Sequence, residues 1–312
     1  MSIWKAYLKT NEKMKKNEKI LVTGATGHYG YAVIESLVEN GMNESLIYAM
    51  ARDDTKVEKL KSLNVNIVFG DYNHYGSMLK AFSGIDKLLF VSSNELENRS
   101  MQHIQVVNAA VESNIKYILY TSQEHKKVNF SLIESVLNSH LATENAIKES
   151  GLNYTILRNG LYMDILPLFL GDKIFSPGIY LPAGNGKIGL ALRSEMAETA
   201  AKVLISNGHK NKIYSVCENS YSFSEIAEYI SRITGKNITY LSPSLDTFLK
   251  TVIDQGMPKA CAKVIGGFAS ATRHGELDSD SLQMAKLLGR KPVSVEQYLE
   301  EIFYWKYLRN VV

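Results

Sequence analysis

Long apolar runs, a large excess of one charge and closely spaced cysteines are all missing from this chain. No stretch approaches the roughly eighteen apolar residues that a membrane-spanning helix needs. The formal net charge is only +3, which gives no reason to expect nucleic acid or a membrane as the main partner. Cys217 and Cys261 are the only cysteines, and their spacing predicts neither a metal site nor a redox pair. We therefore expect a cytoplasmic protein without a metal.

The N-terminal segment lacks a feature as well. Residues 1–18 carry several lysines but no apolar core, so they do not read as a secretory signal. We expect them to form an N-terminal extension ahead of the first strand. The chain is otherwise long enough for one large α/β domain with a smaller lobe.

A glycine-rich segment is the strongest local signal. Residues 19–22 read as a short apolar strand, and residues 31–38 as an amphipathic helix. Between them Gly24-x-x-Gly27-x-x-Gly30 would let phosphate oxygens approach the backbone, next to a helix N-terminus with unpaired N–H groups. This spacing differs from the G-x-G-x-x-G fingerprint, so an ordinary βα turn is the alternative. A second apolar strand at residues 46–51 completes a βαβ unit and favours diphosphate binding.

Strands and helices then alternate as far as residue 160. Further strands are predicted at residues 66–69, 86–93, 117–122 and 153–158, and helices at residues 56–63, 75–82, 101–112 and 132–148. Strict alternation with solidly apolar strands is typical of parallel sheets covered on both faces. Residues 19–160 are thus predicted to form a Rossmann-type doubly wound parallel sheet that binds a nucleotide cofactor.

The pattern changes after Asn159. Glycine and proline crowd residues 171–189 and predict irregular loops. Later residues predict helices at 195–206, 245–254 and 279–288, strands at 213–216 and 238–241, capping boxes at Ser222 and Ser294, and a break at Gly266-Gly267. We expect residues 161–312 to form mainly a smaller C-terminal α/β substrate lobe, with some segments returning to the Rossmann core.

Polar and small residues follow the predicted strands, where open parallel sheets bind ligands. Arg52 follows the second strand, and an arginine there accommodates the 2′-phosphate of NADPH, whereas NAD sites usually carry an acidic residue. Asp53 and Asp54 weaken this argument, and a solvated role for Arg52 stays open. Asp71 and Tyr72 could flank the adenine, with the Asp71 carboxylate accepting from its amino group, or they could belong to a plain turn. The remaining members of this set are Ser92, Ser93, Asn94, Thr121, Ser122, Asn159 and Gly160.

The chemistry is constrained by another absence. Short-chain dehydrogenases carry a catalytic Tyr-x-x-x-Lys, and none of the 18 tyrosines here has lysine four residues on. Reactions that need a placed acid or base, such as alcohol–ketone exchange or epimerisation, are therefore disfavoured. In those enzymes the motif lies on the helix after the fifth strand. The helix predicted at that place here carries His140-x-x-x-Glu144 instead. His140 could donate a proton or orient an acceptor, or the pair could be an intrahelical contact at the edge of the core.

Several of these segments together resemble the NmrA-like atypical short-chain dehydrogenase/reductases. Within that family the chain is most similar to the bacterial branch that reduces quinones with NADPH, with triphenylmethane reductases as near relatives. The resemblance runs from about Lys19 to Phe303. The segments that carry it are Thr23-Gly24-Ala25-Thr26-Gly27-x-x-Gly30, Arg52, Val91-Ser92-Ser93, Tyr120-Thr121-Ser122, His140-x-x-x-Glu144, Leu157-Arg158-Asn159-Gly160-x-Tyr162 and Gly184-x-Gly186-Lys187.

The resemblance implies NADPH as cofactor and roles for individual residues. Arg52 would hold the 2′-phosphate, and Ser92 with Ser93 would lie on the ribose side. Asn159, Gly160 and Tyr162 would border the nicotinamide and the acceptor. The residues implied at the diphosphate are Gly24, Thr26, Gly27, Tyr29 and Gly30, with His28 in a pair that varies within the family.

The expected function is hydride transfer from NADPH to a quinone or a similar flat electrophilic acceptor. The cofactor carries the difficult step, and His140 or Tyr162 could supply a proton. The alternative is an NADP(H)-sensing regulatory protein without turnover, which the family also includes. We expect a small-molecule substrate, no nucleic acid or membrane partner, and a monomer or homodimer.

Overall fold

The computed structural model describes residues 17–95, 97–126, 133–171, 174–175, 178–279 and 282–303. The chain divides into two compact units. The first unit comprises the chain up to Ser122 together with Leu141–Leu157 and Ala197–Ile213, and the second comprises Gln123–His140, Arg158–Met196 and the chain from Tyr214. The expected N-terminal extension lies almost entirely outside the described residues. Within the described ranges, no helix is both long and apolar enough to cross a membrane.

The first unit is built on a seven-stranded sheet with the order β10-β6-β5-β4-β1-β2-β3. Neighbours β1–β2, β1–β4, β2–β3 and β4–β5 are parallel. The strand order reverses between β1 and β4, so the predicted doubly wound Rossmann-type sheet is confirmed. The strands are β1 (Ile20–Val22), β2 (Ile47–Ala51), β3 (Asn66–Phe69), β4 (Lys87–Phe90), β5 (Tyr117–Gln123), β6 (Asn153–Asn159) and β10 (Lys212–Val216), the last three continuing into the second unit.

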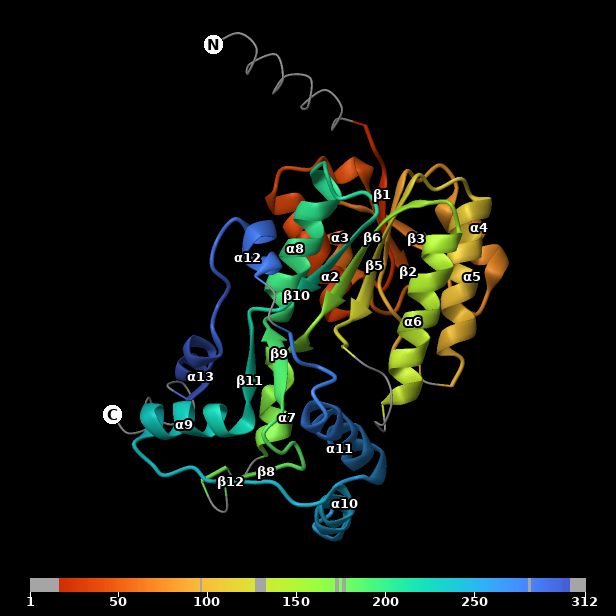
Figure 1. The fold of residues 1–312 in the computed structure, drawn as a ribbon. Helices are drawn as coiled ribbons and strands as arrows, with labels where there is room; N and C mark the ends of the chain where they lie inside the picture. The colour runs from red at the N-terminus through yellow and green to blue at the C-terminus, as the bar shows by residue number, and fades with distance from the viewer. Residues whose placement is uncertain are drawn as a thin grey trace, which may run out of the picture. The chain divides into compact units, whose positions relative to one another are not determined.

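Helices cover both faces of this sheet (Figure 1). Buried side chains of α4, α5 and α6 pack with Leu88, Phe90 and Tyr120 of the strands into one core cluster, while α2 and α8 lie on the other face. The apolar strands are buried because helices remove both of their faces from water. The helices are α2 (His28–Glu39), α3 (Glu58–Lys61), α4 (Tyr75–Phe82), α5 (Arg99–Glu112), α6 (Glu134–Glu149) and α8 (Arg193–Ile205), with a 3-10 turn at Glu44–Leu46.

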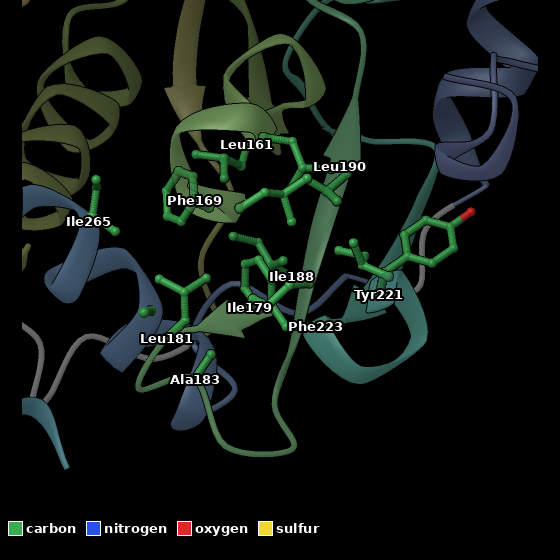
Figure 2. Packing of buried hydrophobic residues seen from close by; sticks show 14 of the residues in the cluster. Leu161, Phe169, Ile179, Leu181, Ala183, Ile188, Leu190, Tyr221, Phe223 and Ile265 are labelled. Atoms are coloured by element: carbon green, nitrogen blue, oxygen red, sulfur yellow. The ribbon is translucent and has the colours of Figure 1, made fainter. Parts of the chain in front are cut away.

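The second unit has its own sheets and core. A three-stranded sheet has the order β11-β9-β7, and β12 pairs with β8 in parallel. Figure 2 shows its core, in which Phe169, Ile188 and Phe223 belong to one buried cluster. The elements are β7 (Leu161–Tyr162), a 3-10 turn (Met163–Ile165), α7 (Leu166–Leu170), β8 (Ile179–Tyr180), β9 (Lys187–Ala191), β11 (Asn219–Ser222), α9 (Phe223–Thr234), β12 (Tyr240–Leu241), α10 (Leu245–Asp254), α11 (Lys259–Arg273), α12 (Gln283–Leu288) and α13 (Val295–Phe303).

Two expectations for this region were wrong. The glycine-rich stretch is not all irregular, because β8 and β9 run through it. The expected break at Gly266-Gly267 does not occur, because α11 continues through both glycines. A Cβ on Gly266 would lie 3.0 Å from Leu245 Cδ1 of α10. Glycine therefore allows close packing of two helices here rather than ending one.

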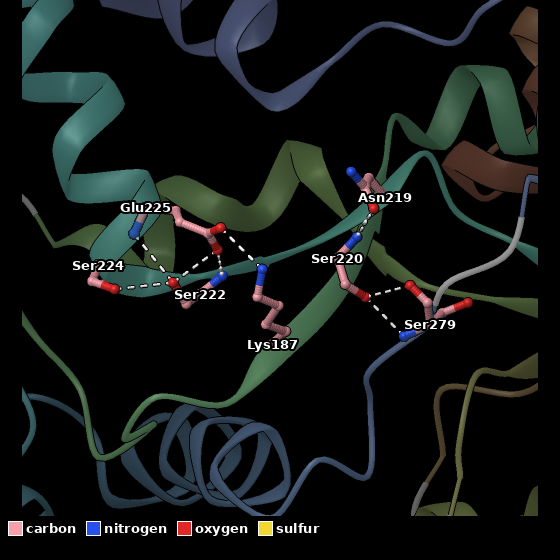
Figure 3. A network of polar contacts seen from close by, with 7 residues as sticks. All are labelled: Lys187, Asn219, Ser220, Ser222, Ser224, Glu225 and Ser279. Carbon is pink, nitrogen blue, oxygen red and sulfur yellow. Dashed lines mark hydrogen bonds and ion pairs between the residues drawn. The ribbon is translucent and has the colours of Figure 1, made fainter.

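Both predicted capping boxes are present. The Ser222 hydroxyl accepts the N–H of Glu225 at 3.2 Å, and the Glu225 carboxylate accepts the N–H of Ser222 at 2.7 Å (Figure 3). Ser294 and Gln297 make the same exchange at the start of α13. The predicted helix at 279–288 is shorter, beginning at Gln283, and part of its predicted range lies outside the described residues.

Candidate cofactor-binding site

The glycine turn joins β1 to α2 at the carboxyl edge of the sheet. Gly24 has φ +60°, a left-handed conformation that favours glycine, and the Gly27 N–H donates to the Gly24 carbonyl at 3.0 Å. A Cβ on Gly30 would lie only 2.4 Å from that same carbonyl oxygen. Glycine at these positions therefore lets α2 begin directly against the end of β1.

The outer side of this turn is open to a ligand. Gly24, Thr26, Gly27 and His28 are exposed, whereas Tyr29 is buried. α2 has no side-chain cap at Gly27 and no acidic residue in its first turn. Its first N–H groups and positive dipole end thus suit an anion such as a diphosphate.

The loop after β4 lies against this turn. A Cβ on Gly24 would be 3.3 Å from Val91 Cβ, so the two segments are in direct contact. Tyr72, after β3, donates its hydroxyl proton to the Val91 carbonyl at 2.8 Å. The N–H groups of residues 91, 92 and 93 donate in order to Thr23 Oγ1 (2.9 Å), Thr121 Oγ1 (2.9 Å) and His103 Nε2 (3.0 Å).

The two predicted residues on β5 have different partners. Thr121 orders the β4 loop as described, and it is 3% exposed. Ser122 donates to Glu144 Oε1 at 2.7 Å, and Lys148 Nζ lies 3.5 Å from Glu144 Oε2. The Glu144 carboxylate is completely buried. Its contacts with a hydroxyl and a cation satisfy that buried charge.

Arg52 lines a hollow at the carboxyl ends of β2 and β3. The hollow has a volume of about 660 Å³, within the range of small-molecule sites, roughly 300–1,000 Å³. The exposed ring of Phe69 contributes an apolar wall. The lining residues are Arg52, Phe69, Gly70, Asp71, Asn73, His74, Tyr75, Gly76 and Ser77.

The charges around Arg52 are arranged so that its guanidinium stays available. Asp53 Oδ1 accepts the N–H of Thr55 at 2.9 Å and also pairs with the Thr55 hydroxyl. These hydrogen bonds, with a smaller effect of Arg52, lower the pKa of Asp53. Across the described residues, no carboxylate lies within ion-pair distance of Arg52.

Asp71 is held in a local turn and lines the same hollow. Its Oδ1 accepts the N–H of Asn73 at 2.8 Å, and its own N–H donates to Ser77 Oγ at 3.0 Å. The turn was one of the two alternatives for this residue. The residue also lines the hollow, so a contact with the adenine remains a prediction.

The three residues predicted to act in catalysis, which are Asn159, Tyr162 and His140, belong to the second unit. Asn159 is 4% exposed, and its carbonyl oxygen accepts from the Glu124 N–H at 2.8 Å. Its side-chain Oδ1 is buried and has no hydrogen-bond partner among the described residues. The Arg193 guanidinium lies over the Tyr162 ring, with 4.7 Å between Arg193 Cζ and the ring centroid. His140 is buried, at 4% exposure.

The family-like segments of the second unit have a packing explanation. A Cβ on Gly160 would lie 2.6 Å from the Gly189 carbonyl, and one on Gly186 would lie 1.8 Å from the Thr272 carbonyl. Lys187 pairs with Glu225 at 3.0 Å (Figure 3). Positions 160 and 186 accept only glycine, because neighbouring backbone atoms occupy the space that a side chain would need.

The sequence placed Tyr72 at this site through its position after a predicted strand, whereas His103 was not recognised as part of the site. Both hold the loop after β4 through side chains that come from other elements. His103 occupies a buried position on an amphipathic helix, so its sequence pattern resembles that of a core residue. For Tyr72 the strand-end position was a sufficient signal, but its hydrogen bond to the Val91 carbonyl was not predictable from the sequence.

The residues of the first unit fit a dinucleotide. The exposed glycine turn and the uncapped start of α2 suit a diphosphate, and the unpaired Arg52 in its hollow suits a phosphate on the adenosine ribose. The chemistry of the groups present is therefore suited to a phosphorylated nucleotide.

Comparisons with known proteins give the same family. The profile of the NmrA-like family matches residues 16–299. Quinone oxidoreductase 2 of Escherichia coli (strain K12) is 31% identical over 286 residues, which cover 91% of this chain and 98% of that protein. Triphenylmethane reductase of Citrobacter sp., solved with NADP(H), has 33% identity and a TM-score of 0.83, with coverage of 91% of this chain and 99% of that one.

A second solved relative is an NADPH-dependent quinone oxidoreductase from Escherichia coli in complex with NADPH. It has 31% identity and a TM-score of 0.83, with coverage of 91% of this chain and 99% of that one. These relatives match nearly the full length of the described fold, and the family profile matches most of the chain. The chain belongs to the NmrA-like family.

Proposed function

We propose that this chain is an NADPH-dependent reductase that transfers a hydride to a quinone or a similar flat electrophilic acceptor. Two full-length relatives are named for quinone reduction and for triphenylmethane dye reduction. Arg52 carries the cofactor assignment, because it lines a hollow beside the second strand and no carboxylate of the described residues pairs with it. A guanidinium in that position attracts a phosphate and gives no advantage to a bare ribose hydroxyl.

The first unit would hold NADPH through groups already described. The turn from Gly24 to Gly30, including Thr26, His28 and Tyr29, would hold the diphosphate, and Arg52 the 2′-phosphate. Asp71 would lie near the adenine. The remaining residues that we assign to the cofactor are Ser92, Ser93, Thr121 and Ser122.

Bound NADPH supplies a hydride, and a quinone needs that hydride and one proton to become a hydroquinone. The chain therefore has to position the acceptor and exclude competing reactions rather than provide a strong base. We assign this role to Asn159, Tyr162 and His140, where His140, Tyr162 or water provides the proton. The buried, unpartnered Asn159 Oδ1 supports a polar contact with a ligand group.

We also propose a reducing, cytoplasmic location and a small-molecule substrate. Cys217 and Cys261 are both free thiols, which supports a compartment without disulfide formation. A monomer or homodimer without a nucleic-acid partner stays our expectation.

The test is an acceptor panel. Purified protein is mixed with NADPH and a series of simple quinones and triphenylmethane dyes, and cofactor oxidation is followed by absorbance. Acceptor-dependent oxidation with at least one class is expected. Tight NADPH binding without turnover across the panel would instead favour an NADP(H)-sensing regulator, and absence of NADPH binding would reject both functions.

A further inference from the structure

The loop after β4 is held in an unusual way. Three successive backbone N–H groups, of residues 91–93, each donate to a side chain from a different part of the first unit. Two acceptors are threonine hydroxyls, and the third is His103 Nε2 on α5. This loop contacts the glycine turn at Gly24, so its shape affects the same edge of the sheet.

The hydrogen bonds of His103 define its protonation state. Nε2 accepts the Ser93 N–H at 3.0 Å and therefore carries no proton. The ring proton is then on Nδ1, which lies 2.8 Å from Thr143 Oγ1 and can donate to it. The completely buried ring packs edge-on against Phe90, with centroids 5.0 Å apart.

The neutral form is favoured by the surroundings of the ring. Burial, together with the nearby Arg99 guanidinium, lowers the pKa of His103 to about 3. The side chain is therefore an acceptor for Ser93 throughout the neutral pH range. No water can replace it without a change in packing, because the ring is inaccessible.

The fixed loop leaves one hydroxyl available. Ser93 Oγ accepts the N–H of Glu95 at 3.1 Å. By contrast, the half-buried Ser92 hydroxyl has no hydrogen-bond partner in the described part of the chain. A polar group held at the carboxyl edge of β4 without a partner is suited to a ligand hydroxyl.

We propose that His103 is a positioning residue for the cofactor: by accepting the Ser93 N–H it fixes the β4 loop and presents the Ser92 hydroxyl to the ribose of NADPH. This inference rests on the proposed function. His103 itself does not contact the cofactor in this proposal, and its effect passes through residues 91–93.

The experiment compares two replacements of His103 in the full chain. His103→Leu removes the acceptor but keeps an apolar side chain, and His103→Gln places an amide oxygen near the position of Nε2. Amide hydrogen exchange of the peptide that contains residues 91–93 is measured without cofactor, and NADPH dissociation constants are measured by titration. We expect His103→Leu to accelerate exchange and weaken NADPH binding about tenfold, and His103→Gln to restore both to within about threefold.

Val107→Ala is the matched control, because Val107 is buried on the same helix and belongs to the apolar core cluster. It should lower thermal stability without accelerating exchange of the loop or weakening NADPH binding. If His103→Leu does not fold, His103→Ala takes its place with the same expected shifts.

Unchanged exchange and binding in the Leu variant would overturn the inference, as would equal effects of His103→Leu and Val107→Ala. Failure of His103→Gln to recover binding, while it remains as stable as the wild type, would also overturn it. A wild type that does not bind NADP(H) would reject the proposed function together with the role of this loop. If the wild type binds NADPH normally, a negative result with the His103 variants therefore rejects only the role of His103 and leaves the proposed function standing.

Discussion

At the scale of single residues, two kinds of position are important. At one kind a charged group has no partner among the described residues, and at the other kind there is no space for a side chain. Arg52 keeps its guanidinium free because Asp53 is turned toward Thr55. Gly30 has no space for a side chain beside the Gly24 carbonyl. The contact of Arg52 with a ligand stays a prediction, but its placement at the carboxyl edge of the sheet was predictable because it follows a predicted strand. His103 was not, since its partner is set by tertiary contacts.

Arg52→Ala should separate the two nicotinamide cofactors. Loss of a charge-assisted contact with the 2′-phosphate is expected to raise the KM for NADPH about 10- to 100-fold. The KM for NADH should change little, because NADH has no phosphate there. Steady-state kinetics with one quinone and both cofactors measure the difference.

Lys56→Ala removes another exposed cation close to Arg52 in the sequence and serves as the control. It should leave the ratio of the two KM values near that of the wild type. Equal losses with NADPH and NADH in Arg52→Ala would contradict the assignment.

Gly30→Ala should weaken both folding and cofactor binding. The added Cβ would lie 2.4 Å from backbone oxygen, and relief of that contact has to shift the turn, at a cost of about 1–3 kcal/mol. Urea unfolding and NADPH titration measure the two effects. Gly76→Ala is the control for stability, because a Cβ there meets nothing within 4 Å. A Gly30→Ala protein as stable as Gly76→Ala would show that the turn relaxes freely.

At the scale of elements, most helices and strands followed from local patterns. The predicted helix at 245–254 has the bounds of α10, and α8 begins and ends within two residues of its prediction. The failures have two causes, which are tertiary packing that overrides a local signal and strands that are too short to give one. Gly266 is tolerated within α11 because α10 packs closely there. Short strands such as β7 and β8 contain too few residues to show a period.

Ser222→Ala should destabilise α9. The substitution removes the hydroxyl that accepts the Glu225 N–H, and loss of such a cap typically costs about 1 kcal/mol. Ser222→Thr keeps a capping hydroxyl and should lose less. Urea unfolding followed by circular dichroism measures the series, and equal stability of the Ala and Thr variants would show that the cap contributes nothing.

At the scale of the whole molecule, the sequence predicted the class of fold well. It predicted less well which stretches of the chain combine into each compact unit. Alternating apolar strands and helices predicted the parallel sheet because each strand is buried on both faces. The second unit combines residues from three separate stretches of the chain, a pairing that depends on non-local contacts. Its substrate role, and the expected boundary at residue 160, remain predictions.

Saturating NADP+ should stabilise the folded chain, because a ligand that binds only the native state shifts unfolding by mass action. At a concentration 100 times the dissociation constant, the gain is about 2.7 kcal/mol. Thermal unfolding with NADP+ and with NAD+ measures it, and the larger shift is expected with NADP+. In Arg52→Ala, NADP+ and NAD+ should raise the unfolding temperature by similar amounts. A persistent difference between the two cofactors would mean that another group recognises the phosphate.

Acid should destabilise the wild type through His103. Its native pKa of about 3 lies below the ordinary value of 6.5, so between these pH values the unfolded chain binds a proton that the native chain excludes. Stability is therefore lost as pH falls from 6.5 toward 3. At about pH 4.5 this difference corresponds to about 2–3 kcal/mol.

The comparison with His103→Gln isolates this effect, because other acid-sensitive groups such as Asp86 and Asp278 are common to both proteins. Urea unfolding at neutral pH and near pH 4.5 should show a steeper fall for the wild type. Parallel falls would indicate that the native pKa of His103 is not lowered and that the proposed acid sensitivity does not come from this residue.

The two free thiols differ in their surroundings. Cys217 is 1% exposed and its pKa is raised by burial to about 11, whereas Cys261 is exposed on α11. Thiolate is the reactive form, so a maleimide dye should attach to Cys261 and leave Cys217 unmodified. The unaltered protein thus carries a single attachment point for a fluorescent reporter on the second unit, without the need to engineer a cysteine.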